Sequence, residues 1–319
     1  MTKHIYVYSP SGAVRDKAAF RRGVRRLESQ GHAVEVDEAA LQSHQRFAGD
    51  DDTRLAAIHR AAASGADVAL ISRGGYGLTR LLHRINYKAL AKAVEGGTQF
   101  VGISDFTALQ LALLAQTGHT TWSGPALCEG FGGLPKGTDT EGHGEAHGAP
   151  DDIMEACFDD MLQGQGEGVG WRQPAKDIRL VQPDWAIKNA TLWGGNLCVL
   201  TSLLGTPFFP QIKGGVLFLE DVAEHPYRVE RMLTQLLHAG VLARQKAIIL
   251  GQFTHFKLSA HDRGFKLNTV IQWLRSQVSV PVVTHLPFGH VPTKVLLPVG
   301  AKVEVVVQGR DVLMAWGHV

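Results

Sequence analysis

One short stretch of the sequence places a serine where it could act as a nucleophile. Ser104 follows the apolar run 99–103 and precedes apolar residues at helical spacing, among them Leu109 and Leu113. A serine on a strand-to-helix turn exposes its hydroxyl beside the helix N-terminus, where developing negative charge is stabilised. However, the sequence GISDF is not GxSxG, and serine or aspartate before a helix is an ordinary cap. Position alone leaves both interpretations open.

Three further stretches contain groups that such a serine needs. RGGYG at 73–77 offers backbone N–H groups to a phosphate or an oxyanion, Glu220 and Asp221 close the apolar run VLFLED, and His290 stands in PFGH. Each also has a structural interpretation: a tight turn, a pair of helix caps, and a histidine on a surface loop. Together they supply what acyl transfer requires, namely a hydroxyl, an imidazole, a carboxylate and N–H donors.

Phosphate and metal chemistry have weaker support. RGGYG has neither the GxGxxG spacing of a dinucleotide fold nor the Lys-Ser/Thr pair of a P-loop. His143 and His147 flank Glu145, but glycines interrupt this segment and it is not HExxH. We therefore expect a solvated loop there, no metal site and no cofactor.

The elements that position these residues alternate between strand-like and helical patterns over the first hundred residues. Strand-like runs lie at 5–9, 32–37, 67–77 and 99–103, and helical patterns lie at 15–30 and 53–64. This alternation predicts a Rossmann-like, mostly parallel sheet, which binds ligands at the carboxyl ends of its strands. RGGYG and Ser104 both follow such ends, so we expect them to face one cleft.

The rest of the chain has a different character. Residues 129–170 are rich in Gly, Asp, Glu and His and predict a linker region with a short helix at 152–162. Beyond residue 171, a helix at 227–240 lies among strand-like runs at 215–221, 246–253, 280–286, 301–307 and 311–316. The sequence thus predicts an N-terminal α/β domain over 1–128 and a smaller, β-rich C-terminal domain over 171–319.

Composition limits the classes of partner. With 319 residues, 45% of them hydrophobic, the chain can bury a sizeable core. A net charge of +2 gives no electrostatic reason to expect nucleic acid or a membrane surface as partner. Cys128, Cys157 and Cys198 are too few and too scattered for a disulfide framework, which fits a reducing compartment. The N-terminus has no signal-peptide pattern and no run is long enough to span a membrane, so we expect a cytoplasmic protein.

The motifs together resemble the LD-carboxypeptidases, also called muramoyltetrapeptide carboxypeptidases. From SPSG at residue 9 to LPVGA ending at residue 301, they include RGGYG, GISDFTALQ, SGP, TLWGGNL, LEDVAEHPYRVERML and PFGH, in the family's order. The resemblance implies a two-domain serine peptidase with Ser104, Glu220 and His290 as its triad. It also implies an oxyanion hole formed by the N–H of Asp105 and one from the RGGYG turn, assigned to Gly75.

The same resemblance implies the reaction. A family enzyme hydrolyses the bond between the third residue, usually meso-diaminopimelate, and the terminal D-Ala of a peptidoglycan tetrapeptide during wall recycling. His290 would carry the proton, Glu220 would orient the imidazole, and Asp105 would act through its backbone. Arg73 and Asn196 are candidates to bind the substrate carboxylate, although an Asn beside two glycines is also typical of turns. A homodimer is implied as well.

Other functions remain open at this point. Immunity peptidases that cleave peptide-nucleotide antibiotics share the triad, and Trp122, Trp171, Trp185 and Trp193 could offer a platform for a nucleobase. A non-catalytic module that binds muropeptides would keep the cleft without turnover. The match of TLWGGNL and LEDVAEHPYRVERML favours the wall-recycling branch, and the want of a phosphate motif disfavours a nucleotide-binding protein.

Overall fold

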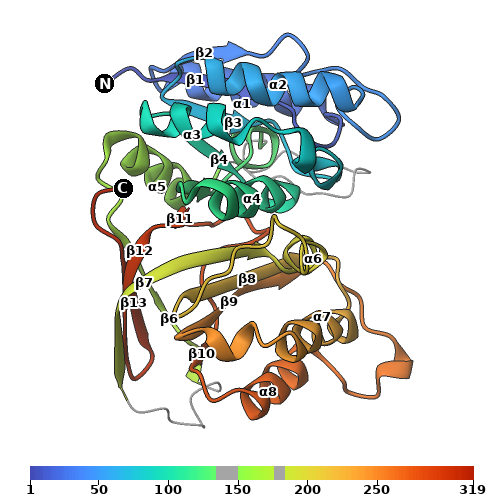
Figure 1. Ribbon diagram of the computed structural model, residues 1–319, viewed down its shortest axis with the longest axis vertical. Helices are drawn as coiled ribbons and strands as arrows, with labels where there is room; N and C mark the ends of the chain where they lie inside the picture. The colour runs from blue at the N-terminus through green and yellow to red at the C-terminus, as the bar shows by residue number, and fades with distance from the viewer. Residues whose placement is uncertain (134–149, 176–183) are drawn as a thin grey trace.

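The protein consists of two bodies, each built on its own β-sheet (Figure 1). The computed structural model describes residues 1–133, 150–175 and 184–319. The N-terminal half, blue to green, forms the upper body, and the yellow to red half forms the lower body. Helix α4 (Thr107–Thr117) lies between them. The predicted α/β class is confirmed, with a mostly parallel first sheet and a second, mixed sheet.

The first sheet has the strand order β11-β5-β4-β3-β1-β2. Its parallel strands are β1 (His4–Tyr8), β2 (Ala33–Val36), β3 (Val68–Ile71), β4 (Gln99–Gly102) and β5 (Thr121–Ser123). β11 (Leu297–Val299) comes from the far end of the chain and pairs antiparallel with β5. The C-terminal part of the sequence therefore completes the N-terminal sheet.

Alternating residues of β1 point into different layers. Ile5 and Val7 pack with α1 (Lys17–Ser29) and α5 (Asp152–Gln163), whereas Tyr6 and Tyr8 pack with α2 (Asp51–Ala63), α3 (Tyr87–Glu95) and α4. Asp16 caps α1 and Asp50 caps α2, each through a side-chain oxygen that accepts from the first turn. The sheet is thus covered on both faces, as parallel sheets require.

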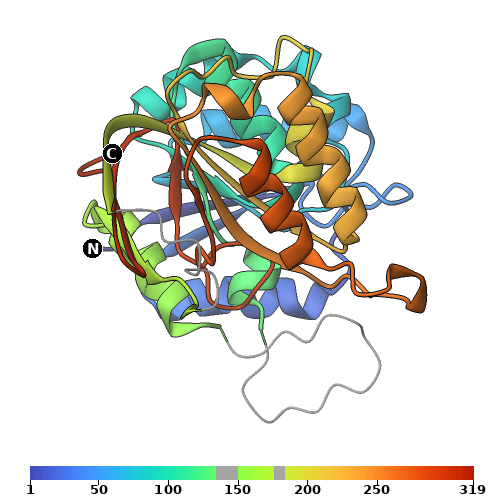
Figure 2. The same cartoon turned by 90° about the horizontal axis from the view of Figure 1, so that it is seen from below.

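The second sheet has the order β10-β9-β8-β7-β12-β13-β6. The strands are β6 (Gly168–Arg172), β7 (Trp185–Asn196), β8 (Val216–Val222), β9 (Ala247–Thr254), β10 (Val282–Val283), β12 (Lys302–Gln308) and β13 (Asp311–Ala315). β7 to β10 pair in parallel, and β12, β13 and β6 add antiparallel strands. Viewed from below, α7 (Pro226–His238) and α8 (Leu267–Gln277) lie side by side over this sheet (Figure 2).

Several elements differ from the sequence-based expectation. The predicted strand 280–286 shortens to β10, because the chain turns after it at His285, which has a φ of +64°. β7 was not predicted, and β6 begins inside the segment predicted to be a linker.

Helix α4 is buried on all sides. Each residue from Thr107 to Leu114 is buried, since α4 packs against α3 and β5 above and against β7 and α6 (Leu197–Ser202) below. One hydrophobic cluster consequently runs through α4 from Phe100 in the first sheet to Phe218 in the second. Within the described ranges, no helix is both long and apolar enough to cross a membrane.

Candidate active site

Ser104 lies at the turn between β4 and α4. It opens a single 3-10 turn, Ser104–Phe106, and α4 begins at the next residue. Its φ of +67° is a left-handed conformation, which costs a non-glycine residue about 1–2 kcal/mol. Neither this turn nor α4 receives a side-chain cap, so the interpretation of Ser104 as a helix cap is wrong. A strained serine on a strand-to-helix turn suits a presented nucleophile.

The RGGYG turn packs directly against this serine. A Cβ on Gly74 would lie 2.6 Å from Ser104 Cβ and 2.9 Å from Ser104 Oγ, so a side chain at Gly74 would displace the hydroxyl. Gly75 has a φ of +115°, and the backbone N–H of Gly12 donates to the Gly74 carbonyl at 3.2 Å. Turns after β1, β3 and β4 therefore meet at the carboxyl edge of the first sheet.

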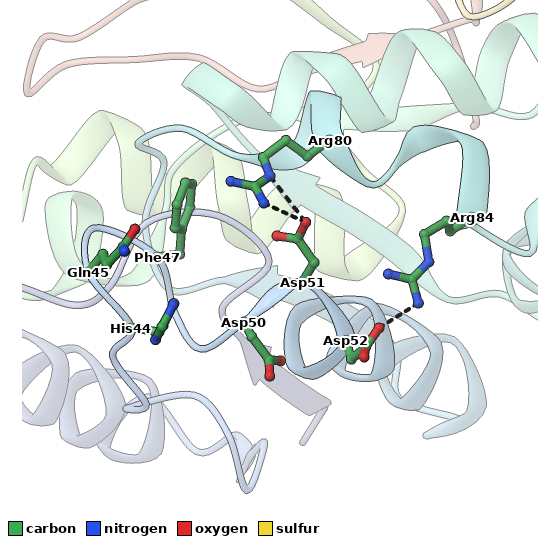
Figure 3. A pocket seen from close by; sticks show the side chains of 8 residues that line it. All are labelled: His44, Gln45, Phe47, Asp50, Asp51, Asp52, Arg80 and Arg84. Atoms are coloured by element: carbon green, nitrogen blue, oxygen red, sulfur yellow. Dashed lines mark hydrogen bonds and ion pairs between the residues drawn. The ribbon is translucent and has the colours of Figure 1, made fainter.

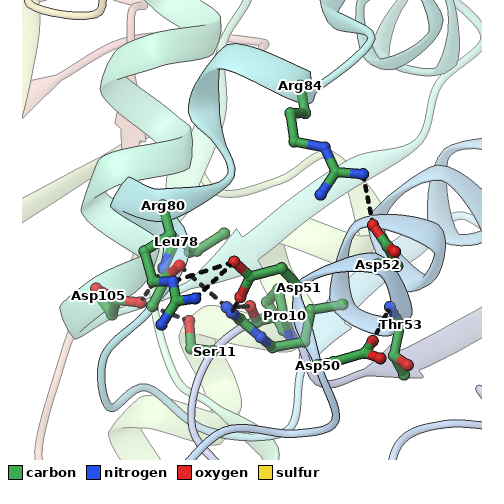
Figure 4. A network of polar contacts seen from close by, with 12 residues as sticks. Pro10, Ser11, Asp50, Asp51, Asp52, Thr53, Leu78, Arg80, Arg84 and Asp105 are labelled. Carbon is green, nitrogen blue, oxygen red and sulfur yellow. Dashed lines mark hydrogen bonds and ion pairs between the residues drawn. The ribbon is translucent and has the colours of Figure 1, made fainter.

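The carboxylate of Asp105 ties the serine turn to two neighbouring loops (Figure 4). Its Oδ2 accepts from Ser11 Oγ at 2.8 Å and from the Leu78 N–H at 2.9 Å. Burial raises the pKa of Asp105, against the lowering effect of these hydrogen bonds and of the nearby Arg54. The sequence predicted a role for Asp105 through its backbone alone, and the structure adds this bracing by the carboxylate.

Arg54 holds the same loops in place through a second set of hydrogen bonds. Its side chain is fully buried, and Nη1 donates to the carbonyl oxygens of Pro10 at 3.2 Å and Gly77 at 3.0 Å, while Nη2 pairs with Asp51. A buried cation that lacked these partners would be costly, so the contacts fix the loops on either side of Ser104. None of this network was foreseen from the sequence, although SPSG at 9–12 was noted as a motif.

The imidazole and its carboxylate partner come from the second body. Glu220 stands near the end of β8 with no exposed surface, and its Oε2 contacts His290 Nδ1 at 2.8 Å. This contact engages Nδ1 and leaves Nε2 available to receive a proton. Gly289, at φ +142°, lets the histidine loop approach β9, because a Cβ there would lie 2.9 Å from the Gln252 carbonyl oxygen.

Electrostatics favour the protonated form of this histidine. Burial opposes a charged imidazole, but the charge of Glu220 and its hydrogen bond outweigh burial and raise the pKa of His290 above 6.5. A carboxylate that stabilises the imidazolium is what a serine nucleophile needs when its proton is transferred. The interpretation of Glu220 as a helix cap does not hold, because the N-cap of α7 is His225.

Asn196 holds Glu220 in place through hydrogen bonds of its side-chain amide. Its Nδ2 donates to Glu220 Oε1 at 3.1 Å and to Asp221 Oδ1 at 2.9 Å, and its Oδ1 caps α6 at Val199. Both amide hydrogens are used in these contacts and the residue is buried, which shows a positioning role, while its role in substrate binding stays a prediction. Burial and the charge of Glu220 raise the pKa of Asp221 to about 7.

Thr107 links the two halves of the site. The Asn196 N–H donates to Thr107 Oγ1 at 3.0 Å, and Gly195 leaves room for this contact, because a Cβ there would lie 2.6 Å from the same oxygen. The serine turn and the Glu220–His290 pair are thereby joined through one threonine. Among the described residues, no hydrogen bond joins Ser104 Oγ to His290 directly.

The sequence is also similar to proteins of one known family. Models of the LD-carboxypeptidase N-terminal and C-terminal domains match residues 5–124 and 189–305. The muramoyltetrapeptide carboxypeptidase of Oxalobacter formigenes is 38% identical, and its crystal structure superposes with a TM-score of 0.83 over 98% of each chain. The chain belongs to the LD-carboxypeptidase family.

More distant relatives in the LD-carboxypeptidase family include both a carboxypeptidase and an immunity protein. The probable murein peptide carboxypeptidase of Bacillus subtilis is 28% identical over 86% of this chain and 80% of its own length. The microcin C7 self-immunity protein MccF of Escherichia coli is 24% identical over 95% and 90% of the two chains. A structure of MccF with glutamyl sulfamoyl guanosine has a TM-score of 0.81 over 99% and 97% at 22% identity, which supports the fold alone.

A cavity of about 450 Å³ lies apart from this LD-carboxypeptidase site (Figure 3). None of its lining residues is Ser104, Glu220 or His290. Its arginines are matched by aspartates, with Arg80 bonded to Asp51 at 2.8 Å and Arg84 paired with Asp52. Both arginines are thus neutralised, and Asp50 adds one further negative charge to the lining.

Two further candidates from the sequence are Arg73 and the histidine-rich segment around Glu145. The Arg73 side chain is 11% exposed, donates to the Ala13 carbonyl at 3.2 Å and lies 3.6 Å from Glu129. His143, Glu145 and His147 lie outside the described residues. In the part of the chain that is described, no group of three His, Cys, Asp or Glu side chains is placed to hold a metal ion.

Lys294 was not singled out from the sequence. Its side chain is buried in the loop that carries His290, and burial lowers the pKa of its ammonium group against the charges of Glu129 and Glu220. The only sequence signal was its place between PFGH and LPVGA.

Proposed function

We propose that this protein is a serine-type LD-carboxypeptidase that releases terminal D-Ala from muramoyl tetrapeptides. The observation that carries the proposal is the fully buried Glu220 bonded to His290, joined through Asn196 and Thr107 to a strained Ser104. Structural capping explains neither Ser104 nor Glu220. Nucleophilic catalysis explains both.

In the proposed mechanism, Ser104 Oγ attacks the carbonyl carbon of the third residue while His290 Nε2 takes the hydroxyl proton. Glu220 stabilises the imidazolium and fixes its orientation through Nδ1. The imidazolium then protonates the leaving nitrogen, and D-Ala departs from the acyl-enzyme. Water, deprotonated by His290, hydrolyses the ester and restores the serine.

The tetrahedral intermediate carries a negative oxygen that needs donors. The N–H groups of Asp105 and Gly75 remain our candidates, because Asp105 follows the nucleophile and Gly75 stands in the turn that packs on it. The hydrogen bonds of the Asp105 carboxylate hold the first of these donors in place.

The substrate class is supported by family membership and by the names of two relatives, a muramoyltetrapeptide carboxypeptidase and a murein peptide carboxypeptidase. We extend that activity to this chain as part of the proposal. A role in wall recycling inside the cytoplasm and a homodimeric assembly stay predictions.

The first test measures D-Ala release from UDP-muramoyl tetrapeptide by the wild-type protein. We expect release from the tetrapeptide but not from a pentapeptide, and a loss of about 10³-fold or more in Ser104→Ala. Ser29→Ala, which changes an exposed serine at the end of α1, serves as the matched control and should retain full activity.

Three outcomes would contradict the proposal. Undiminished release by a folded Ser104→Ala protein would remove the nucleophile assignment. Absence of release by the wild type, together with cleavage of an aspartyl sulfamoyl adenosine, would place the chain with the immunity peptidases instead. Tight binding of tetrapeptide with no cleavage of either compound would indicate a binding module.

A further inference from the structure

A second, smaller cavity opens beside the turn that contains Gly75. It measures about 230 Å³ and is walled by the loops that follow β1, β2 and β3. The walls are joined by backbone hydrogen bonds, from the Ala13 N–H to the Arg46 carbonyl at 3.0 Å and from the Gly12 N–H to the Gly74 carbonyl at 3.2 Å. The cavity is therefore a built feature at the carboxyl edge of a parallel sheet, where ligands bind in such folds.

The charges around this cavity have one sign. Arg15, Arg46 and Arg73 line it, and no lining residue is acidic. Arg73 is held by Glu129 and by the Ala13 carbonyl, whereas neither Arg15 nor Arg46 forms an ion pair with any described residue. Arg46 instead lies over the ring of Tyr76, 5.6 Å from its centroid. Two guanidinium groups thus remain available to an anion.

The larger cavity provides an internal comparison. It also contains two arginines, but each is paired with an aspartate of α2 in the same wall. The arginines of the larger cavity are therefore neutralised by aspartates, whereas Arg15 and Arg46 of the smaller cavity have no carboxylate partner among the described residues. The difference points to a ligand that supplies the missing negative charge.

We propose that this cavity binds the free terminal carboxylate of the substrate, with Arg15 and Arg46 as specificity-determining residues beside Arg73. The inference rests on the proposed function and refines it. The terminal carboxylate is two bonds beyond the scissile nitrogen, and the cavity shares Gly75 with the candidate oxyanion hole. The Arg73 guanidinium lies directly beside Gly75, 3.3 Å from the position that a Cβ of this glycine would take, so the cationic wall of the cavity begins at the candidate oxyanion hole.

Size supports the terminal residue over a larger anionic group. About 230 Å³ accommodates one small residue and its carboxylate, but falls below the range of about 300–1,000 Å³ typical of pockets for whole drug-sized ligands. A pocket that ends in cations after a single residue would also explain why a tetrapeptide is accepted and a pentapeptide is not. The diphosphate of a nucleotide-linked substrate is the competing source of anionic oxygen.

The test compares kcat/KM for a tetrapeptide ending in D-Ala and for the same peptide ending in D-alaninamide. We expect the wild type to prefer the carboxylate, and Arg46→Gln and Arg15→Gln each to lower that preference about ten- to a hundredfold, because a neutral amide cannot replace the charged hydrogen bond of a guanidinium. Activity on the amide should stay unchanged. Arg21→Gln, an exposed arginine of α1 that does not line the cavity, is the control.

A second arm measures binding without turnover. Calorimetric Kd values of Ser104→Ala, alone and combined with Arg46→Gln or Arg15→Gln, should show the same selective loss for the carboxylate peptide. This arm separates failure of the inference from failure of the proposed hydrolysis. Equal effects on both peptides, no effect, or no binding of either peptide would overturn the inference. A loss confined to the UDP-linked tetrapeptide would also overturn it, in favour of a diphosphate site.

Discussion

The two halves of the candidate site are held in place by different means. In the first body, backbone turns and glycines position Ser104, whose own φ is strained and whose Cβ touches Gly74. In the second body, side-chain hydrogen bonds position His290 through Glu220 and Asn196, all on or beside regular strands. The nucleophile half depends mainly on shape, with the Asp105 carboxylate bracing its turn, and the base half depends on charge.

This difference shows which substitutions each half tolerates. A backbone turn without room for one methyl group is sensitive to volume, because packed atoms yield only a few tenths of an ångström. A buried carboxylate network is sensitive to loss of charge, even when the replacement has the same shape. Substitutions that change volume in the nucleophile half and charge in the base half therefore distinguish these two sensitivities.

Among substitutions that keep the nucleophile and its base, the largest effect is expected from Gly74→Ala. Its new Cβ would lie 2.6 Å from Ser104 Cβ, so either the hydroxyl or the RGGYG turn must move. A misplacement of this size costs on the order of 10²-fold in rate, which would appear in kcat with a small change in melting temperature. The measurement is steady-state D-Ala release together with thermal unfolding.

Gly170→Ala is the matched control for this substitution. Gly170 lies in β6, and a Cβ there would meet its nearest neighbour, the Val312 carbonyl oxygen, at 3.7 Å, an ordinary contact. We expect normal kcat. A Gly74→Ala enzyme that matched this control would show that the serine turn adapts freely and would contradict its dependence on shape.

Much of the fold could be predicted from local patterns. The strands β1 to β4 of the first sheet and the helix α7 have clear local patterns, whereas the three-residue strand β5 was not predicted. The strand β7 was missed because Gly194 and Gly195 resemble a turn, whereas in the structure a Cβ on Gly194 would lie 1.8 Å from the Phe218 carbonyl oxygen. β11 has three residues and no local signal, since its partner β5 is distant in sequence.

The sequence indicated which side chains form the site better than it indicated the contacts between them. The sequence pointed to Ser104, Glu220 and His290, and the structure joins the last two. The sequence did not predict that both amide hydrogens of Asn196 would be donated to carboxylates. An asparagine beside two glycines is equally typical of a turn. Nor could spacing reveal Arg54, whose partners are carbonyl oxygens on two separate loops.

A smaller effect is expected from Asp105→Ala, which tests the brace behind the serine turn. It keeps the backbone N–H but leaves the Ser11 hydroxyl and the Leu78 N–H without their acceptor. We expect about 1–3 kcal/mol lower stability per unsatisfied group and a kcat about tenfold lower at little change in KM.

Asp105→Asn provides the graded comparison, because its amide oxygen can replace Oδ2 and accept from both donors. Kinetics and urea unfolding of the two variants should rank wild type, Asn and Ala in that order. Asp50→Asn, which preserves a helix cap nearby, is the control and should be neutral. Equal kcat for wild type and Asp105→Ala would remove the positioning role.

The smallest effect concerns the charge of the base half and is read in the titration of His290. A protonated imidazole cannot accept the serine proton, so kcat/KM should fall as pH drops through the pKa of His290, which lies above 6.5. In Glu220→Gln the carboxylate charge is lost while burial remains, so the pKa of His290 should fall. NMR titration of the imidazole measures the change directly, with His59, whose pKa is lowered by burial alone, as the internal control. Coincident titrations of His290 in the two proteins would show that Glu220 acts on this histidine by orientation and not by charge.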